Sequence, residues 1–361
     1  MTSAALISPL PLGRMSESEQ RLLSDVDEVA VFVLPMTIRF RGVTHREGLL
    51  LQGPQGWGEC APFPEYGAKE SSRWLASAVQ CATVPMPTPI RSRVPVNVTI
   101  PVCDPDEARR RISSQRGCST AKVKVADPGH LLEEDAVRVR TVSLALAERY
   151  GEEARVRIDA NTAWSVDEAA MALEYLNEAA DAVGGLEYAE QPVRTVRELA
   201  RLRKMTSVPL AADESIRRSA HPLAVRDEAA VDVAVVKVAP LGGVESAHTL
   251  VSALGLPCAV SSALDTSVGI AAGVALAASL PSLPFACGLN TVTMFGADAV
   301  NHPLIASDGY LDVEEAKETR TGSLTSTAFR VERTVIERWR RRLRFMAQAL
   351  EDHDEAESLP W

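Results

Sequence analysis

The pattern of apolar and polar positions changes twice along the chain, and these changes divide it into parts. Residues 1–28 are mostly polar, with a short helical pattern over Ser16 to Leu23. After them, apolar runs and a following amphipathic stretch predict an antiparallel meander and one helix. The expected elements are strands at 29–34, 37–40 and 45–51 and a helix at Lys69–Ala82. We therefore predict an N-terminal extension at 1–28 and the first part of an α+β domain at 29–90.

From Val94 onward, short apolar runs alternate with longer amphipathic stretches, which is the pattern of repeated βα units. Strands are expected at 94–99, 120–125, 156–159, 185–189, 209–212, 232–238, 257–261 and 285–287. The main helices are expected at 105–115, 129–150, 165–179, 196–205, 222–228, 244–254 and 268–280. Strands joined through helices run parallel, and eight of them predict a closed barrel over 91–300.

The boundaries of the barrel carry separate signals. A proline-rich stretch at 84–89 separates the barrel from the first domain. Within the barrel, Ser165 followed by Glu168 predicts a capping box at the start of one helix. After the barrel, we expect 301–361 to return to the first domain and to end in a basic helix that begins near Thr334.

Five charged residues stand at the ends of successive predicted strands, roughly 20 to 35 residues apart. Lys124 comes first, Asp159, Glu190 and Asp213 follow, and Lys237 ends the series. The ends of parallel barrel strands open into one mouth, so these side chains are expected to meet there. Three carboxylates between two lysines suit a divalent cation flanked by two acid–base groups.

Lys122 and Lys124 lie two residues apart and therefore share one face of their strand. In a barrel that face is the interior, where burial and mutual repulsion lower the pKa of one lysine and produce a neutral amine that can remove a proton. The competing interpretation is that the lysines extend to the rim as solvated charges.

The three carboxylates predict oxygen ligands for a hard cation such as Mg²⁺, and none of the six histidines lies in these segments. A carboxylate at a strand end can also simply cap the next helix, but three in consecutive units favour the metal. Glu214, next to Asp213, is expected outside the direct ligand set. Glu187 is expected outside the barrel interior, because it lies three residues before Glu190.

The composition excludes several classes of protein. A net charge of −10 and a pI of about 5.3 argue against nucleic acid or an anionic membrane as the main partner. The six cysteines form no C-x-x-C pair, which favours buried thiols in a reducing compartment. No apolar run reaches the roughly 18 residues of a membrane span, and no signal peptide is apparent, so a cytoplasmic protein is expected.

Two turns remain as candidate binding elements. Ser261 and Ser262 precede a helix, and their hydroxyl and backbone N–H groups suit a carboxylate as well as they suit plain helix capping. Gly242 and Gly243 could approach a phosphate, but glycine pairs are more often turn formers.

Several segments carry a resemblance to the muconate-lactonizing branch of the enolase superfamily. They are 121–124 (AKVK), 158–161 (IDAN), 189–192 (AEQP), 212–217 (ADESIR), 236–243 (VKVAPLGG) and 260–269 (VSSALDTSVG). Together with 39–42 (RFRG), 46–48 (REG), 56–59 (GWGE) and 94–97 (VPVN), they resemble the o-succinylbenzoate synthases of high-GC Gram-positive bacteria. The similarity covers about residues 29–300.

The resemblance implies a (β/α)7β barrel, a modified TIM barrel, closed by an N-terminal α+β capping domain. It implies Mg²⁺, replaceable by Mn²⁺, on Asp159, Glu190 and Asp213. The implied reaction is the syn-dehydration of 2-succinyl-6-hydroxy-2,4-cyclohexadiene-1-carboxylate to 2-succinylbenzoate in menaquinone synthesis. The implied partner is thus a small-molecule carboxylate, and association of identical copies is compatible with the sequence.

Residue roles follow from the same resemblance. Lys124 would remove the proton α to the carboxylate and then protonate the departing hydroxide. Lys122 would lower the pKa of Lys124, and Lys237 would stabilise the enolate from the opposite side. The further candidates are Ser261, Ser262, Asn161 and Arg39 for substrate, and Glu214 and Asp265 beside the ligands. The loops at 40–46 and 63–68 are expected to shape substrate choice.

The chain departs from the family at Asp265, where the wider subgroup carries Glu, and at Asn290, where a smaller residue is usual. Two other functions stay open. Two lysines on opposite sides of an α-carbon also suit a racemase of N-acylamino acids or another epimerase. A non-catalytic barrel that binds a partner is the third hypothesis. It predicts loss of at least one of six polar residues, and none is lost: Lys122, Lys124, Asp159, Glu190, Asp213 and Lys237.

Overall fold

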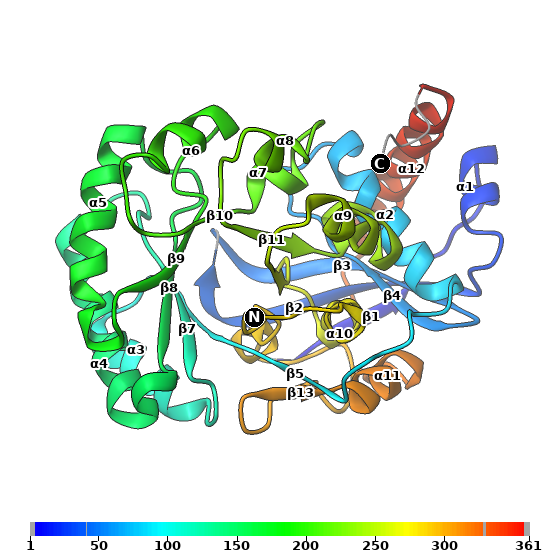
Figure 1. Ribbon diagram of the computed structural model, residues 1–361. Coiled ribbons are helices and arrows are strands. Elements are labelled where there is room, and N and C mark those ends of the chain that lie inside the picture. The colour runs from blue at the N-terminus through cyan, green and yellow to red at the C-terminus, as the bar shows by residue number, and fades with distance from the viewer. Residues whose placement is uncertain (1–3, 41, 328–329, 357–361) are drawn as a thin grey trace.

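The computed structural model of this chain describes residues 4–40, 42–327 and 330–356. It contains a four-stranded sheet in the order β1-β2-β3-β4 and a seven-stranded sheet in the order β12-β11-β10-β9-β8-β7-β6. Figure 1 shows the second sheet curved into a barrel, with green helices on its outer side and the blue strands of the first sheet packed against it. The expected fold class, an α/β barrel with an N-terminal capping domain, is confirmed.

The capping domain is built on an antiparallel sheet with one long helix. Its elements are β1 (Leu6–Pro9), α1 (Glu17–Leu22), β2 (Glu28–Phe40), β3 (Val43–Gly53), β4 (Gly56–Cys60) and α2 (Ala68–Thr83). The prediction of two strands at 29–34 and 37–40 was wrong: β2 is continuous, with an irregular register between Pro35 and Phe40. Proline lacks the N–H that a strand ladder uses, so the sequence looks interrupted where the strand only changes register.

The segment at 1–28 contains a strand that the sequence did not predict. Strand β1 pairs antiparallel with β2, so that Leu6 faces Val33 and Pro9 faces Ala30. Helix α1 lies inside the expected helical stretch and begins after Ser16, whose hydroxyl caps it. The extension is thus an edge of the capping sheet.

The barrel consists of parallel strands that alternate with helices. Its strands are β6 (Val98–Ile100), β7 (Thr120–Lys124), β8 (Arg155–Asp159), β9 (Leu186–Glu190), β10 (Leu210–Ala212), β11 (Val233–Lys237) and β12 (Cys258–Ser261). Its helices are α3 (Pro105–Ser114), α4 (Leu132–Tyr150), α5 (Val166–Ala179), α6 (Val196–Leu202), α7 (Glu214–Arg217), α8 (Ala224–Asp227), α9 (Val244–Leu254) and α10 (Ser267–Ser279). Helix α7 was not expected, and the capping box at Ser165 and Glu168 is confirmed.

The barrel closes through a segment that forms isolated bridges instead of a regular eighth strand. Cys287 bridges Val96 on one side, and Gly288 bridges Ser261 on the other, both in parallel orientation. The Cys287 N–H donates to the carbonyl of Pro95 at 2.7 Å, and the Gly288 N–H donates to the carbonyl of Val260 at 2.8 Å. In place of the strand expected at 285–287, the structure therefore has isolated bridges at Cys287 and Gly288, so the pairing ends one residue later than expected.

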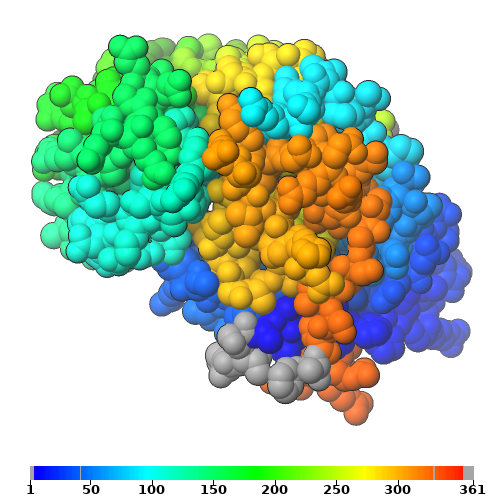
Figure 2. Space-filling model, turned by 90° about the horizontal axis from the view of Figure 1, so that it is seen from below, coloured from blue at the N-terminus to red at the C-terminus, as the bar shows by residue number. Residues whose placement is uncertain are grey.

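The strand expected at 94–99 is divided in two. Only β6 joins the barrel, while β5 (Arg93–Pro95) pairs antiparallel with β13 (Tyr310–Asp312). After β13, α11 (Val313–Thr321) packs on α10, and α12 (Arg333–Ala356) packs on α2 of the capping domain. Figure 2 shows the orange segment around residues 300–320 between the barrel and the blue capping domain.

The floor of the barrel is apolar around one buried arginine. Tyr188, Ala211, Val233, Val235 and Ala259 form a cluster there, with Phe285 packed against it. Arg157, with its side chain 1% exposed, lies over the ring of Tyr188 at 4.7 Å and pairs with Glu187. The prediction that Glu187 lies outside the interior was wrong, because the register of β8 and β9 shifts at this point.

No helix among the described residues is long and apolar enough to cross a membrane.

Candidate active site

The strand ends bring the five predicted charges to one mouth of the barrel. In the register of the sheet, Lys124 on β7 faces Asp159 on β8, and Asp159 faces Glu190 on β9. Asp213 follows β10 directly, and Lys237 ends β11. All three carboxylates are buried, with at most 1% of their surface exposed.

The lysines contact the carboxylates directly. Lys122 Nζ lies 2.7 Å from Glu190 Oε2 and 3.4 Å from Asp159 Oδ2. Lys124 Nζ lies 2.5 Å from Asp159 Oδ2, and Lys237 Nζ lies 2.6 Å from Asp213 Oδ2. The lysine pair is therefore turned into the site, and the alternative of lysines extended to the rim does not hold.

The two lysines of β7 differ in their electrostatic surroundings. Burial lowers the pKa of Lys122, but Glu190 and Asp159 outweigh burial, so that pKa lies well above its ordinary value. Burial also lowers the pKa of Lys124, and the neighbouring Lys122 adds to this effect, so that pKa stays below its ordinary value despite Asp159. Lys124 is thus the lysine that loses its proton more easily, in the direction that the sequence predicted.

The carboxylates provide a donor set that suits a hard cation. Burial and the charges of Asp159 and Asp213 raise the pKa of Glu190 to about 7, although Lys122 opposes them. The Oε1 atom of Glu190 is buried and has no hydrogen-bond partner among the described residues. An unpartnered carboxylate oxygen beside two further carboxylates fits a cation such as Mg²⁺. Among the residues that the structure describes, no group of three acidic, histidine or cysteine side chains is close enough to hold a metal ion as it stands. The carboxylates contact the lysine ammonium groups.

Asn161 connects Lys124 and Asp159 to Glu214 through three hydrogen bonds. Its Oδ1 accepts a hydrogen bond from Lys124 Nζ at 2.6 Å, and its backbone N–H donates to Asp159 Oδ1 at 3.1 Å. Its Nδ2 donates to Glu214 Oε1 at 3.2 Å. A left-handed backbone at Asn161, with φ of 45°, brings these contacts about, and asparagine tolerates that conformation well.

Gln191 is a site residue that sequence reasoning missed. Its Oε1 accepts from the backbone N–H groups of Asp213 and Ser215, both at 3.0 Å. Its Nε2 donates to Ser215 Oγ and to the carbonyl of Val193. The side chain thereby fixes the turn that presents Asp213. The only signal was its place after Glu190 in the segment 189–192.

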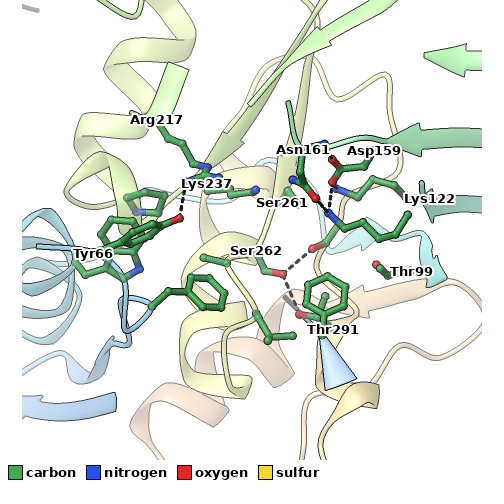
Figure 3. Close-up of a pocket in the computed structure, with 18 residues that line it drawn as sticks. Tyr66, Thr99, Lys122, Asp159, Asn161, Arg217, Lys237, Ser261, Ser262 and Thr291 are labelled. Atoms are coloured by element: carbon green, nitrogen blue, oxygen red, sulfur yellow. Dashed lines mark hydrogen bonds and ion pairs between the residues drawn. The ribbon is translucent and has the colours of Figure 1, made fainter. Parts of the chain in front are cut away.

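Arg217 is the second missed residue, and it joins the two domains. Its guanidinium donates to Asp213 Oδ1 at 3.0 Å, to Glu214 Oε1 at 2.7 Å and to Tyr66 Oη at 3.1 Å. Figure 3 shows this link to Tyr66 on one side of the pocket, with Lys122 and Asp159 on the other. Glu214 accordingly contacts side chains beside Asp213.

The pocket at this mouth is lined from both domains (Figure 3). The capping domain contributes aromatic residues, and the barrel contributes mostly small or polar ones. They are Phe40, Phe63, Tyr66 and Trp74 on the first side, and Thr99, Pro240, Ser261, Ser262, Ala263, Leu264, Gly288 and Thr291 on the second. Phe40, Phe63 and Tyr66 of the segments 40–46 and 63–68 therefore line the pocket, and the role of these segments in substrate choice stays a prediction.

The predicted substrate contacts have different positions. Ser261, Ser262 and Asn161 line the pocket, and Ser262 Oγ donates to the carbonyl of Gly288 at 2.9 Å. Arg39 is exposed and lines a neighbouring groove with Phe40 instead. Asp265 is buried behind the wall of the pocket, where it accepts from the backbone N–H of Ala263 at 3.0 Å.

Asn290 lies outside this pocket. Its Nδ2 donates to Gln115 Oε1 at 2.7 Å, and it lines a separate groove beside α3. The departure at this position is therefore not among the residues that line the pocket, although the neighbouring Thr291 is.

Two protein families match the chain. Residues 31–82 match the family described as enolase N-terminal domain-like, and residues 105–317 match the one described as enolase C-terminal domain-like. Among curated relatives, the o-succinylbenzoate synthase of Thermobifida fusca is 51% identical over 282 residues, or 78% of this chain and 86% of the relative. That of Mycolicibacterium smegmatis is 46% identical over 295 residues, or 81% of this chain and 88% of the relative.

Solved structures share the fold at low identity. The muconate lactonizing enzyme from Pseudomonas fluorescens in complex with muconolactone has a TM-score of 0.67 at 19% identity, and the match covers 87% of this chain and 98% of that one. The L-Ala-D/L-Glu epimerase from Bacillus subtilis has a TM-score of 0.64 at 22% identity, with 79% and 94% covered.

Proposed function

The chain belongs to the o-succinylbenzoate synthases of the enolase superfamily, and we propose that this site dehydrates 2-succinyl-6-hydroxy-2,4-cyclohexadiene-1-carboxylate to 2-succinylbenzoate in menaquinone synthesis. The protein is thus an enzyme of the hydro-lyase class. One observation carries the assignment of the site: Lys124 and Lys237 come from β7 and β11, and both line a pocket beside three buried carboxylates.

Asp159, Glu190 and Asp213 would hold Mg²⁺, or Mn²⁺ in its place. The metal, when bound, would neutralise negative charge on the carboxylate of the substrate and so make the neighbouring C–H bond more acidic. The unpartnered oxygen of Glu190 supports this role. Arg217 and Gln191 support it too, because they hold Asp213 and its turn in place.

Lys124 is proposed as the general base. Its neutral amine takes the proton from the carbon next to the substrate carboxylate, and the resulting ammonium then gives that proton to the departing hydroxide, so that one water leaves and the ring becomes aromatic. The lowered pKa of Lys124 favours the neutral amine that the first step needs. One lysine can serve both steps because the proton and the hydroxide leave from the same face.

Lys122 and Lys237 are proposed to act through their charge. Lys122 stays protonated between Glu190 and Asp159 and keeps the pKa of its neighbour Lys124 low. The ammonium of Lys237 is held by Asp213 and lines the pocket from β11. From there it faces the negative charge that develops on the substrate when the proton leaves.

The experiment that tests the function is a dehydration assay on the wild-type enzyme, followed by loss of the diene absorbance of the substrate. Turnover that requires Mg²⁺, disappears with a chelator and returns with added Mg²⁺ or Mn²⁺ is the expected result. A folded, metal-loaded enzyme that leaves the substrate unchanged would contradict the proposal.

Racemisation of N-succinylamino acids is the alternative chemistry for the same two lysines. It requires Lys237 to exchange a proton with the α-carbon, whereas dehydration requires only its charge. Incubation of an N-succinylamino acid in D₂O separates the two functions, because exchange of the α-proton without dehydration of the diene would favour the racemase. The named relatives favour the synthase, and the intact set of site residues disfavours a non-catalytic barrel.

A further inference from the structure

Two buried charged side chains of the capping sheet contact one loop of the barrel. They are Arg46 on β3 and Glu59 on β4, which are 3% and 6% exposed. The loop follows β12 and runs to the start of α10 at Ser267. It contains the part of the pocket wall formed by residues 262–264, which we call the β12 wall.

Arg46 binds the backbone of the β12 wall. Its Nε donates to the carbonyl of Leu264 at 2.9 Å, and its Nη2 donates to the carbonyl of Ala263 at 3.0 Å. The same guanidinium donates to the carbonyl of Ala61 in its own domain and lies 4.2 Å from the ring centre of Phe63. The wall is thereby attached to a segment that lines the opposite side of the pocket.

Glu59 fixes the far end of the same loop. Its Oε2 accepts from the hydroxyl of Thr266 at 2.6 Å, and from the N–H groups of Thr266 and Gly269 at 3.0 Å each. A Cβ at Gly269 would come within 2.8 Å of that oxygen, so the close approach requires glycine. Burial and the neighbouring Asp265 raise the pKa of Glu59 to about 8, although Thr266 and Arg46 oppose them, and the carboxyl group lies at the N-terminus of α10, where the helix dipole favours its ionised form.

Between these two anchors the backbone has an unfavourable conformation. Leu264 has φ of 63°, which is uncommon for a residue with a branched side chain and costs free energy unless its surroundings impose it. Its side chain is 2% exposed and packs in the hydrophobic core of the capping domain together with Val268. The barrel thus inserts this turn into the other domain, and Arg46 holds its carbonyl.

We propose that Arg46 and Glu59 are positioning residues that hold the β12 wall in its left-handed turn, and so determine how tightly the pocket binds the part of the substrate remote from the reacting carbon. None of the five charges at the strand ends takes part in the contacts of Arg46 and Glu59 with this loop. Loss of these contacts should therefore weaken substrate binding much more than it slows proton transfer. The inference rests on the proposed function, since it concerns the same pocket.

The test uses the full-length enzyme with Arg46→Met, which keeps the length of the side chain and removes its donors. We expect KM to rise about tenfold and kcat to fall less than about threefold. Binding of the product 2-succinylbenzoate, measured by calorimetry, should weaken by a similar factor. Arg46→Lys should lie between the wild type and Arg46→Met, because an ammonium cannot serve all three carbonyls.

The decisive comparison relieves the backbone without restoring the arginine. Arg46→Met/Leu264→Gly removes the cost of the positive φ, whereas Arg46→Met/Leu264→Ala removes nearly the same side chain and keeps that cost. The proposal expects the glycine double variant to recover a lower KM than the alanine one. Equal KM values in the two, or a fall in kcat as large as the rise in KM, would overturn it.

Circular dichroism and thermal unfolding show whether each variant is folded. If Arg46→Met does not fold, Thr266→Val replaces it. That change removes the hydroxyl that donates to Glu59 and that accepts from the Val268 N–H at the start of α10, both at the far end of this loop, and the same rise in KM is expected. Thr266→Val with unchanged KM would count against the proposal. Absence of turnover in the wild type would instead remove the proposed function, so the two failures are distinguishable.

Discussion

The mouth of the barrel and the capping domain form the same pocket, but they are assembled in different ways. In the barrel, each strand of the sheet pairs with the strand of a neighbouring βα unit, and the charged residues at the strand ends meet through these repeated pairings. In the capping domain, β1 pairs with β2, and α12 near the other end of the chain packs on α2. The proposed reactive groups thus lie on the repetitive part of the fold. The aromatic wall comes from residues 40–74 of the capping domain, whose β2 and α2 pack against the two ends of the chain.

This difference separates chemistry from recognition. The barrel contributes Lys122, Lys124 and Lys237, and the capping domain contributes Phe40 and Tyr66. Changes at the strand ends should therefore abolish turnover, while changes in the capping domain should act on binding or on stability.

The largest effect is expected for Lys124→Ala. Removal of the proposed general base for both proton transfers should lower kcat by a factor of about 10³ or more, and exchange of the α-proton with D₂O should disappear as well. Lys204→Ala, on an exposed lysine of the same barrel, is the matched control. Residual turnover within about tenfold of the wild type would place the base elsewhere.

The series of strand ends explains why so much of the site could be predicted. Each charge follows an apolar strand in its own βα unit, so spacing alone brings the five together. Helix α9 at Val244–Leu254 has the expected bounds for the same reason, because its signals are local.

The missed features depend on partners distant in the sequence. Strand β1 contains only four residues and is recognisable only by its pairing with β2. The spacing of Arg217 from Asp213 and Glu214 is a local signal for its ion pairs, but its contact with Tyr66 has none, since Tyr66 belongs to the other domain. The closing segment at Cys287 and Gly288 is equally dependent on β6 and β12, and its few residues have no strand periodicity of their own.

Arg217→Met should give the next largest effect, and it tests the link between the domains. Without the arginine, Asp213 loses a buried charged partner, and the affinity for Mg²⁺ should fall about tenfold to a hundredfold. Calorimetric titration with Mg²⁺ measures this without turnover. Arg218→Met is the control, because Arg218 lies over the ring of Tyr66 and pairs with Glu70 instead of Asp213. Equal loss of affinity in both variants would show that Tyr66 matters and the contact with Asp213 does not.

Glu19→Gln tests the joined chain ends, and a loss of stability with unchanged kcat is expected. The Glu19 side chain is buried, pairs with Arg340 of α12 and accepts from the backbone N–H of Ser16 at 2.8 Å. Loss of these charge-assisted bonds should cost about 2 kcal/mol, measured by thermal unfolding at pH 7. Glu17→Gln, an exposed change in the same turn, is the control.

The difference in stability between the wild type and Glu19→Gln should depend on pH in a definite direction. Burial raises the pKa of Glu19, but Arg340 and Ser16 outweigh burial, so the pKa in the folded protein is lowered from 4.5. The stabilisation is therefore fully present above the pKa of the unfolded chain and is lost as the pH falls below it. The gap in unfolding midpoint between wild type and Glu19→Gln should narrow in acid. A gap that stays constant from pH 7 to pH 3 would assign the effect to packing.

The smallest effect is expected for Arg39→Ala, although Arg39 belongs to a segment that resembles the family. The side chain is exposed and lines a neighbouring groove, whereas Phe40 beside it lines the pocket with its ring centre 5.4 Å from Lys124 Nζ. Arg39→Ala should therefore change kcat/KM by less than about threefold, and Phe40→Ala by about tenfold or more. Steady-state kinetics at two ionic strengths show whether Arg39 contacts the substrate directly or only attracts it from a distance. A long-range charge effect weakens with salt, whereas a direct contact persists. A salt-independent tenfold rise in KM for Arg39→Ala would mean that the arginine turns inward onto bound substrate, and the capping domain would then contribute a charge to recognition as well as its aromatic wall.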